Sequence, residues 1–405
     1  MTSNRWLYLP VEVKVRELDA KLLLSYYAIK QGYQVIIGDH PTVEEASSHF
    51  PRGIFLTKGG PKGFRKRTIT NAKTNRQTIV ELDEEGLLIE KAKYTRDRMR
   101  KDMLKFVEQE YCWGDHQKQI ISSAYPDMTT KCKVVGNPRL DLLTAKYREI
   151  YRDEATAIQE TYQDFILVNT RFSLYNKAKA VNENRFVKPI KKLYEAFLEM
   201  IEVLAKEFPT KNIVIRPHPG ENIRSYQHAF SQYQNVHVVH EGTIIKWLLA
   251  ANVIIHNGCT SGIEAFLLDK PVIAYIPVVE KDNTLPNQVG LQVETLASLH
   301  QAILNISNYN QLKRTPKSLY HYCFLENDSY SYQRILHLCN RISLPSPPLK
   351  ISPRRISIQK QKRRFSLLEN ELTHFYQKID DIEQDSFQRH IKQIAPNAYR
   401  VQAIP

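Results

Sequence analysis

Polar side chains follow an apolar run in VIRPHPGE, residues 214–221. Pro217 and Pro219 cannot continue the hydrogen-bond ladder of a sheet, so the chain must turn where the run ends. Arg216 offers a permanent positive charge on a fork of donors, and His218 can donate to a phosphate oxygen or a base carbonyl. Loops at the carboxyl ends of parallel strands form ligand crevices, so this loop is a candidate anion site. The alternative is a proline-stiffened turn whose polar side chains face solvent.

A second candidate lies about 40 residues later, where an apolar run at 253–256 leads into Asn257 and Gly258. Thr260 and Ser261 then stand where a helix should begin. Amides at a helix N-terminus, with hydroxyl groups beside them, bind phosphate well, and glycine lets the backbone approach a ligand closely. A simple helix cap is the alternative, but the two motifs together favour a nucleotide-phosphate site.

A third candidate is ELDEEGLL, residues 81–88, in which Glu84 and Glu85 precede Gly86. Repulsion between neighbouring carboxylates raises the pKa of at least one of them. A general base that deprotonates a hydroxyl nucleophile needs such a carboxylate. A solvated acidic turn would have the same composition.

Charged residues near two expected helix starts complete the set. Glu264 lies one turn into the helix that opens at Thr260, within reach of a ribose diol. Lys14, Arg16 and Glu17 follow the first expected strand and could line an acceptor site. All four could equally be solvated charges on a helix face.

The elements that must position these residues alternate between apolar strands and amphipathic helices, twice over. Such alternation predicts an α/β protein with two Rossmann-like domains facing a central cleft. We expect four parts: an acceptor domain at 1–145, a nucleotide-donor domain at 146–340, a basic proline-rich linker at 341–365 and a helical tail at 366–405.

Composition narrows the class of protein. The 405 residues are 42% hydrophobic and 25% charged, and the net charge of +14 predicts attraction to polyanions. We expect no signal peptide and no membrane span, because no run of about 18 apolar residues occurs. Five scattered cysteines without a CxxC pair predict reduced thiols in a cytoplasmic protein, and the histidines lack metal-ligand spacing.

The order of the motifs resembles a known group of enzymes. Glu84-Glu85-Gly86, then His218-Pro219, then Thr260-Ser261 resembles the bacterial sialyltransferases and Kdo transferases of the GT-B type. LPVEVKVRELDAKLLL, GNPRLDLL, RPHPGE and HNGCTSGIEA look like the bacterial surface carbohydrate (capsule or lipopolysaccharide) biosynthesis proteins and echo the CDP-glycerol glycerophosphotransferases. The resemblance covers about residues 1–340.

This resemblance implies roles on the donor side. His218 and Pro219 would hold a cytidine nucleotide, with His218 also needed for catalysis. Thr260 and Ser261 would hold its phosphate, and Glu264 its ribose. The resemblance also implies that Arg216-Pro217 fits the surface-carbohydrate group better than the sialyltransferases, which leaves the donor sugar open.

On the acceptor side the resemblance implies that Glu85, or its neighbour Glu84, is the base of a metal-independent glycosyltransferase without a cofactor. The expected partners are a nucleotide-sugar, CMP- or CDP-linked, and a glycan or glycolipid acceptor. Seven cations between residues 350 and 364, with no acid among them, suit an anionic membrane surface at the inner face of the cytoplasmic membrane.

Other readings use the same residues. The architecture also suits a CDP-glycerol-type glycerophosphotransferase or a UDP-sugar 2-epimerase, which would need several acid–base groups and no acceptor site. A nucleic-acid-binding protein would explain the charge, but no nucleic-acid motif appears, so we expect no nucleic-acid partner. A nucleotide-binding relic without catalysis is the fourth possibility.

Overall fold

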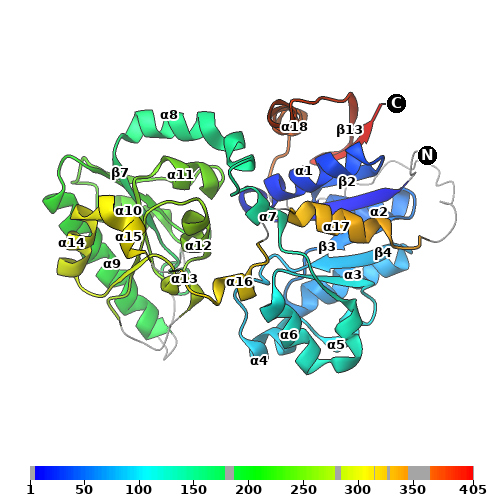
Figure 1. Ribbon diagram of the computed structural model, residues 1–405, viewed down its shortest axis with the longest axis horizontal. Helices are drawn as coiled ribbons and strands as arrows, with labels where there is room; N and C mark the ends of the chain where they lie inside the picture. The colour runs from blue at the N-terminus through cyan, green and yellow to red at the C-terminus, as the bar shows by residue number, and fades with distance from the viewer. Residues whose placement is uncertain are drawn as a thin grey trace. The chain divides into compact units, whose positions relative to one another are not determined.

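The computed structural model describes residues 5–177, 187–278, 284–313, 315–325, 329–344 and 365–404. The chain folds into two compact units (Figure 1). The first unit combines Met1–Leu142 with Tyr320–Pro405, and the second unit is Leu143–Leu319. Each unit contains a sheet of mainly parallel strands with helices packed against it, so the α/β class is confirmed.

The first unit is built on an eight-stranded sheet of order β13-β14-β2-β1-β3-β4-β5-β6. Its strands are β1 (Trp6–Val11), β2 (Gln34–Asp39), β3 (Ile54–Thr57), β4 (Thr78–Leu82), β5 (Gln109–Cys112), β6 (Cys132–Val134), β13 (Arg389–Ala395) and β14 (Ala398–Ala403). Its main helices are α1 (Lys14–Lys30), α2 (His40–His49), α3 (Lys62–Thr74), α4 (Lys91–Asp97), α5 (Lys101–Leu104), α6 (Asp115–Ala124), α17 (Ser331–Asn340) and α18 (Glu369–Glu383).

The first six strands are parallel, and β1 is buried along its whole length. A strand covered on both faces must be apolar throughout, which explains the uninterrupted run WLYLPV. Tyr8 and Phe55 stack within the core on one face of this sheet, beside Ile36 and Ile69. These strands therefore form a rigid frame whose carboxyl ends carry the polar loops.

The end of the chain differs from the prediction. Residues 320–340, expected in the donor domain, and the described part of 366–405, expected as a helical tail, belong to the first unit. The tail contains α18 and then a hairpin of β13 and β14. The hairpin joins the sheet because β14 pairs antiparallel with β2. Gly38 permits this pairing, because a Cβ there would lie 2.2 Å from the carbonyl oxygen of Asn397. Local periodicity could not reveal a strand pairing across more than 350 residues.

The second unit is built on a six-stranded sheet of order β12-β11-β10-β7-β8-β9, with every pair parallel. Its strands are β7 (Phe165–Asn169), β8 (Asn212–Arg216), β9 (Val236–Val238), β10 (Val253–His256), β11 (Val272–Tyr275) and β12 (Leu291–Val293). Its main helices are α8 (Arg152–Tyr162), α9 (Val187–Glu207), α10 (Ile223–Ala229), α11 (Ile244–Ala250), α12 (Thr260–Leu267), α13 (Leu285–Gln288) and α14 (Leu296–Leu304).

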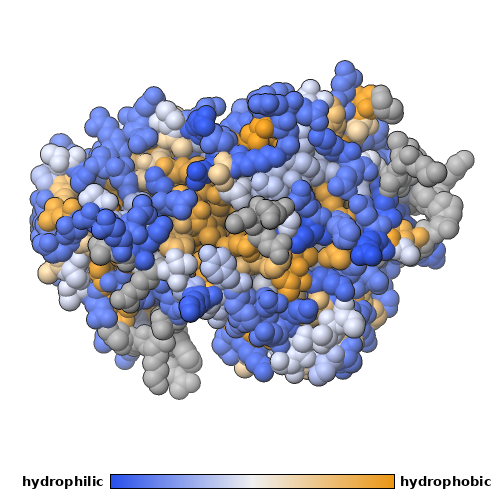
Figure 2. Space-filling model, viewed as in Figure 1, coloured by the Kyte–Doolittle hydropathy of each residue, from blue (hydrophilic) through white to orange (hydrophobic). Residues whose placement is uncertain are grey.

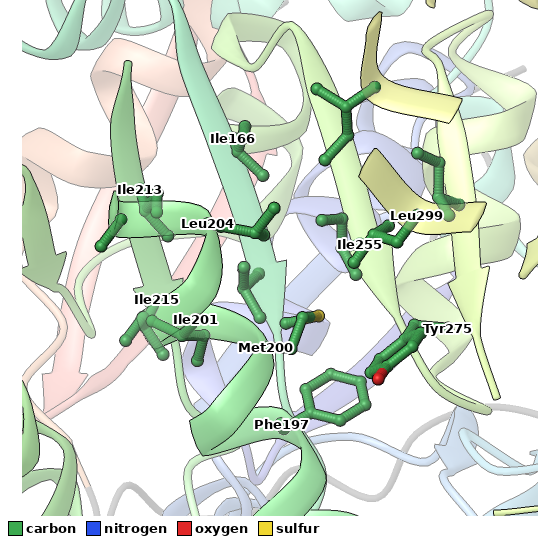
Figure 3. Close-up of a cluster of buried hydrophobic side chains, with 14 of the residues drawn as sticks. Ile166, Phe197, Met200, Ile201, Leu204, Ile213, Ile215, Ile255, Tyr275 and Leu299 are labelled. Carbon is green, nitrogen blue, oxygen red and sulfur yellow. The ribbon is translucent and has the colours of Figure 1, made fainter. Parts of the chain in front are cut away.

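The long helix α9 supplies much of the core of the second unit. Phe197, Met200, Ile201 and Leu204 recur at helical spacing and pack against β-strand side chains such as Ile213 (Figure 3). This spacing places one apolar stripe along the helix, which anchors it to the sheet.

Strand order locates the point in each sheet where connections change direction. In the first unit, β2 lies on one side of β1, whereas β3 to β6 lie on the other, so the switch point is between β1 and β3. In the second unit, β8 and β9 lie on one side of β7 and β10 to β12 on the other, so it is between β7 and β10. Ligands of doubly wound sheets bind outside the carboxyl ends of the strands at this point.

The molecular surface drawn in Figure 2 is largely hydrophilic. Within the described ranges, no helix is both long and apolar enough to cross a bilayer. Residues 345–364 of the predicted basic linker, which include its seven cations, lie outside the described residues.

Candidate functional site

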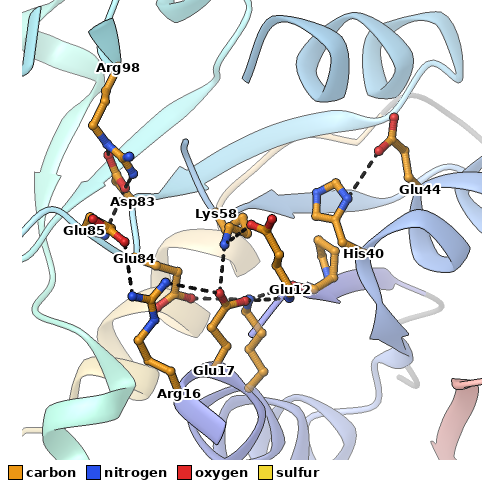
Figure 4. A network of polar contacts seen from close by, with 12 residues as sticks. Glu12, Arg16, Glu17, His40, Glu44, Lys58, Asp83, Glu84, Glu85 and Arg98 are labelled. Carbon is orange, nitrogen blue, oxygen red and sulfur yellow. Dashed lines mark hydrogen bonds and ion pairs between the residues drawn. The ribbon is translucent and has the colours of Figure 1, made fainter. Parts of the chain in front are cut away.

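Charged side chains gather at the switch point of the first unit (Figure 4). Glu12 follows β1 and Lys58 follows β3, so the two loops that diverge there carry opposite charges. Lys58 Nζ lies 2.6 Å from Glu12 Oε2 and donates to Glu17 Oε1 at 2.8 Å. The sequence analysis did not single out Lys58, because its importance depends on which strands are neighbours.

Glu17 is the centre of this cluster. Its side chain is fully buried and also accepts hydrogen bonds from Lys21 Nζ at 3.1 Å and from the amide of Glu12 at 2.8 Å. Burial alone would raise the pKa of Glu17, but the charges of Lys21 and Lys58 outweigh it and lower the pKa to about 2. The prediction that Glu17 contacts the acceptor is therefore corrected: Glu17 holds the two lysines in place.

The two predicted base candidates have opposite surroundings. Glu84 is buried, 3.3 Å from Lys21, and burial followed by the charge of Glu17 raises its pKa. Glu85 has 54% of its side chain exposed and pairs with Arg16 at 3.1 Å. Glu85 is thus open to solvent, whereas Glu84 faces the lysine cluster. Glycine is required at 86, because a Cβ there would lie 2.7 Å from the side chain of Trp113.

The remaining acceptor candidates lie at the start of α1. Arg16 bridges Glu85 and Glu17, with its second nitrogen 3.8 Å from the latter carboxylate. Lys14 donates to the carbonyl of Ser366 at 2.6 Å and pairs with Glu371 of α18. Lys14 therefore helps to attach the tail, while Arg16 orients the exposed carboxylate.

Arg171 occupies the switch point of the second unit, just after β7. Gly258, just after β10, has φ +58°, and a Cβ there would lie 2.7 Å from the Arg171 guanidinium. Glycine at position 258 therefore leaves room for the Arg171 guanidinium against the backbone of the loop after β10. The amide of Gly258 donates to Oδ1 of Asn287 from α13, which fixes the loop. Arg171 and Asn287 are absent from the sequence prediction.

The loop after β8 presents His218 to solvent. Pro217 is buried, whereas His218 and Pro219 are exposed, and Nδ1 of His218 accepts from the amide of Gly220 at 3.1 Å. This bond leaves Nε2 as the protonated nitrogen of the neutral ring, able to donate. The backbone of His218 donates to the buried carboxylate of Glu221 at 3.0 Å.

Glu221 is a support that the sequence analysis did not assign. Its Oε1 also accepts from the Thr170 hydroxyl at 2.9 Å, and its Oε2 from the Tyr226 hydroxyl at 2.6 Å. Thr170 precedes Arg171, so this carboxylate connects the loop after β7 with the loop after β8. Two of the predicted ligand loops are thereby held together at one edge of the sheet.

Arg216 has a different place from the predicted one. Its guanidinium donates to the carbonyls of Glu241 at 2.7 Å and Gly242 at 3.2 Å, and it lies 5.1 Å from the ring centre of Trp247. Burial lowers its pKa to about 10. Arg216 therefore attaches the end of β8 to the loop before α11. Arg171 is the better candidate for a cationic side chain that would bind a phosphate.

The helix that was expected to open at Thr260 does so. Thr260 and Ser261 are the first two residues of α12, and the half-buried Cys259 is its N-cap. Asn257, in contrast, is buried and donates to the carbonyl of Tyr275 at 2.8 Å, which ties β10 to β11. The prediction that Asn257 contacts the nucleotide donor is therefore corrected: its side chain has a structural role.

Glu264 is buried in α12 rather than on the surface, with 3% exposure. Below the same helix lies His256, fully buried at the end of β10. A Cβ at Gly262 would lie 2.2 Å from its Nε2, so glycine allows α12 to pack directly on the imidazole. Burial, and then the charge of Arg171, lowers the pKa of His256 to about 3, so it is neutral.

The thiol and metal predictions concern other residues. All five cysteines lie in described parts of the chain and are free thiols, as expected. Within the described ranges, no group of three or more His, Cys, Asp or Glu side chains is placed to hold a metal ion. Metal independence remains a prediction.

Comparison with known proteins adds a fold relationship. No protein-family model and no curated protein matches the sequence. The UDP-GlcNAc 2-epimerase from Methanocaldococcus jannaschii matches with a TM-score of 0.55 at 12% identity, over 84% of this chain and 99% of the other. The wall teichoic acid polymerase TagF matches with a TM-score of 0.57 at 14% identity, over 84% and 89%.

A third structure, UDP-GlcNAc 2-epimerase from Neisseria meningitidis bound to UDP-GlcNAc, matches with a TM-score of 0.52 at 12% identity, over 84% and 100% of the two chains. At these identities the likeness shows the fold. The chain thus has the GT-B-like fold of two α/β units, as predicted.

Proposed function

We propose that this chain is a GT-B glycosyltransferase that moves a sugar from a cytidine-nucleotide donor to a hydroxyl group of a surface polysaccharide or lipid-linked glycan. The observation that supports it most is the placement of Arg171, Gly258 and the start of α12 at one switch point, beside the exposed His218. Among the fold relatives, a TagF structure was soaked with CDPG and an epimerase was solved with UDP-GlcNAc and UDP.

The second unit would bind the donor. Arg171 and the first amides of α12 hold the donor phosphate, because a guanidinium and a helix N-terminus both favour an anion. The hydroxyl of Thr260 adds a donor at the same place, whereas the hydroxyl of the buried Ser261 donates to Cys259 Sγ at 3.0 Å. His218 donates from Nε2 to the nucleotide. Glu264 would reach the ribose only from within its buried position, which makes it the least exposed member of the predicted set.

The first unit would bind the acceptor and supply the base. The carboxylate of Glu85 takes the proton of the acceptor hydroxyl as its oxygen forms a bond to the anomeric carbon. The bond from that carbon to the donor phosphate breaks, and the nucleotide leaves with the electron pair. Arg16 orients the base, and the lysines held by Glu17 add positive potential nearby. Glu84, with its raised pKa, is the second candidate for this role.

A thermal-shift titration with CMP, CDP, UDP and GDP tests the donor assignment. Ligand at 100 times its dissociation constant adds about 2.7 kcal/mol to the stability of the folded state. Wild type should respond most to a cytidine nucleotide, and both Arg171→Gln and His218→Ala should lose that response. His228→Ala changes another exposed histidine of this unit and should keep it. An equal response to every nucleotide, or none, would overturn the cytidine assignment.

Turnover separates the alternatives. A glycosyltransferase releases nucleotide in proportion to glycosylated acceptor, whereas a 2-epimerase interconverts two nucleotide-sugars without an acceptor. A glycerophosphotransferase releases CMP from CDP-glycerol and adds glycerol phosphate to the acceptor. Epimerised donor in the absence of acceptor would replace the proposal by the epimerase, and activity that survives EDTA is expected if no metal takes part.

The seven cations at 350–364 support a further part of this proposal, a peripheral contact with anionic membrane. Truncation at 341 is no test, because the tail after residue 365 is part of the first unit. Replacing the seven cations by glutamine in the full chain keeps that part intact. Co-sedimentation with phosphatidylglycerol vesicles should then fall at least tenfold, and unchanged binding would refute this contact.

A further inference from the structure

The first unit has a basic pocket that the assignments above do not use. It has a volume of about 190 Å³, whereas one water molecule takes about 30 Å³ in the liquid, so it has room for a small polyatomic ion. Six charged residues contribute to its lining: Lys62, Arg65, Lys66, Arg98, Arg100 and Asp102. Five of the six are cations, contributed by α3 and by the segment that joins α4 to α5.

The three arginines are held in place by carboxylates. Each guanidinium has one carboxylate partner: Arg65 with Glu81 at 2.7 Å, Arg98 with Asp83 at 3.0 Å, and Arg100 with Asp102 at 3.2 Å. Arg65 is 1% exposed and therefore has no freedom to turn away. The pairs of Arg65 and Arg98, which are mostly buried, keep these two guanidinium groups ordered before any ligand arrives, which reduces the entropy cost of binding.

The two lysines supply the charge that is not offset. Lys62 and Lys66 lie one turn apart on α3, both exposed, and neither forms an ion pair with a described residue. Their surroundings add to the potential, since residues 62–76 contain six basic and no acidic residues and residues 91–105 contain seven basic and two acidic ones. Two unpaired positive charges over ordered guanidinium groups suit a dianion.

The pocket is connected to the proposed base. Asp83, which holds Arg98, also accepts a hydrogen bond at Oδ1 from the amide of Glu85 at 3.0 Å. An anion bound beside Arg98 therefore lies against the same turn that presents the exposed carboxylate.

We propose that this pocket binds a phosphate group of the acceptor, so that the acceptor is a phosphorylated glycan. The assignment of the group to the acceptor rests on the proposed function, whereas the affinity of the pocket for phosphate does not. Two sources share this chemistry: a phosphate within the glycan itself, and the phosphate of a lipid headgroup. Lys62 and Lys66 pair with the dianion, and Arg98 and Arg100 contribute hydrogen bonds at its sides.

The test compares Lys62→Gln/Lys66→Gln with the matched control Lys91→Gln/Lys93→Gln, which removes two exposed charges from α4 of the same unit. Calorimetric titration with inorganic phosphate and with glycerol 3-phosphate measures the pocket directly. The pocket variant should bind each at least about tenfold more weakly than wild type, since each lysine contributes a hydrogen bond to a charged group. The control should bind like wild type.

Three outcomes would overturn the assignment, and a fourth identifies the source of the phosphate. Wild type that does not bind either probe removes the site, and an equal loss in both variants reduces it to general surface charge. Phosphatidylglycerol vesicles test the lipid source. If the protein binds vesicles but not glycerol 3-phosphate, and both variants weaken vesicle binding equally, the positive charge serves a membrane surface instead. Binding of both soluble probes at the pocket, with vesicle binding unchanged in the pocket variant, places the phosphate in the glycan.

Turnover distinguishes failure of the pocket from failure of the proposed function. If transfer occurs, the pocket variant should raise KM for a phosphorylated acceptor about tenfold, with kcat and the KM for donor close to wild type. Phosphate binding without any transferase activity would retain the pocket and remove the proposed function. Transfer with unchanged acceptor KM in the pocket variant would remove the acceptor role of the pocket.

Discussion

Replacing Glu17 by Gln separates the framework of the first-unit site from its chemistry. Glu17 is fully buried and accepts three hydrogen bonds, two of them from the ammonium groups of Lys21 and Lys58. Gln keeps the shape but removes the charge, so both lysines, each less than 10% exposed, lose the carboxylate between them. Breaking a buried ion pair from one side is costly, because the remaining charges stay desolvated.

The pKa of Glu17 gives the size of the effect. It is about 2 in the folded protein, against 4.5 ordinarily. One pKa unit corresponds to about 1.4 kcal/mol, so the carboxylate contributes about 3 kcal/mol. Because the folded pKa is the lower one, this contribution is complete above pH 4.5 and is lost as the pH falls toward 2. We therefore expect Glu17→Gln to lower the free energy of unfolding by about 3 kcal/mol at pH 7, and by progressively less below pH 4.5.

Urea unfolding followed by tryptophan fluorescence measures this in the first unit alone. In a Trp247→Phe background the remaining tryptophans, Trp6 and Trp113, both belong to that unit. Glu85→Gln is the control: its side chain is 54% exposed, so stability should change by less than about 0.5 kcal/mol while transfer activity falls strongly. If Glu17→Gln unfolds within 0.5 kcal/mol of its parent at pH 7, the buried cluster does not have the role described here.

Four further substitutions test the packing of the two units. Gly262→Ala should destabilise the second unit by at least about 1–3 kcal/mol, because the new Cβ meets His256, whereas Gly63→Ala in α3 meets nothing within 4 Å and should stabilise by about 0.5–1 kcal/mol; thermal unfolding compares the two. Arg65→Met should cost about 3–5 kcal/mol in urea unfolding, since it leaves a buried carboxylate without its cation. Glu110→Gln should instead gain stability relative to wild type as the pH rises from 5 to 7, because burial raises the pKa of Glu110 well above 4.5 and wild type must keep it protonated; parallel pH dependences would contradict this.

The loops that carry the candidate residues could be predicted from local sequence. An apolar run that ends in prolines marked the loop of His218, and a run that ends in Asn-Gly, followed by hydroxyl residues, marked the start of α12. Both signals lie within one strand and its next turn. Which side chains in those loops face a ligand was not predictable in the same way. Arg216 and Asn257 look like ligands by type, yet their partners are carbonyls of Glu241 and Tyr275, on segments 18 or more residues away.

Two of the residues that the sequence analysis missed, Lys58 and Arg171, depend on strand order. Lys58 matters because β3 lies next to β1, and Arg171 because β7 lies next to β10. Strand order is a long-range property, whereas hydrophobic periodicity reports only which face of an element is buried. A sequence-based search could still have included them among its candidates. In each unit the loop after the first strand and the loop after the strand on the far side of the reversal must meet, so every charged residue directly after a strand was a candidate once a doubly wound sheet was predicted. For Lys58 and Arg171, the strand pattern supplies two of the facts that this rule needs: the ends of the strands and their parallel direction. It does not supply the third fact, the strand order, so it could not single these two residues out from the other charged residues that follow strands.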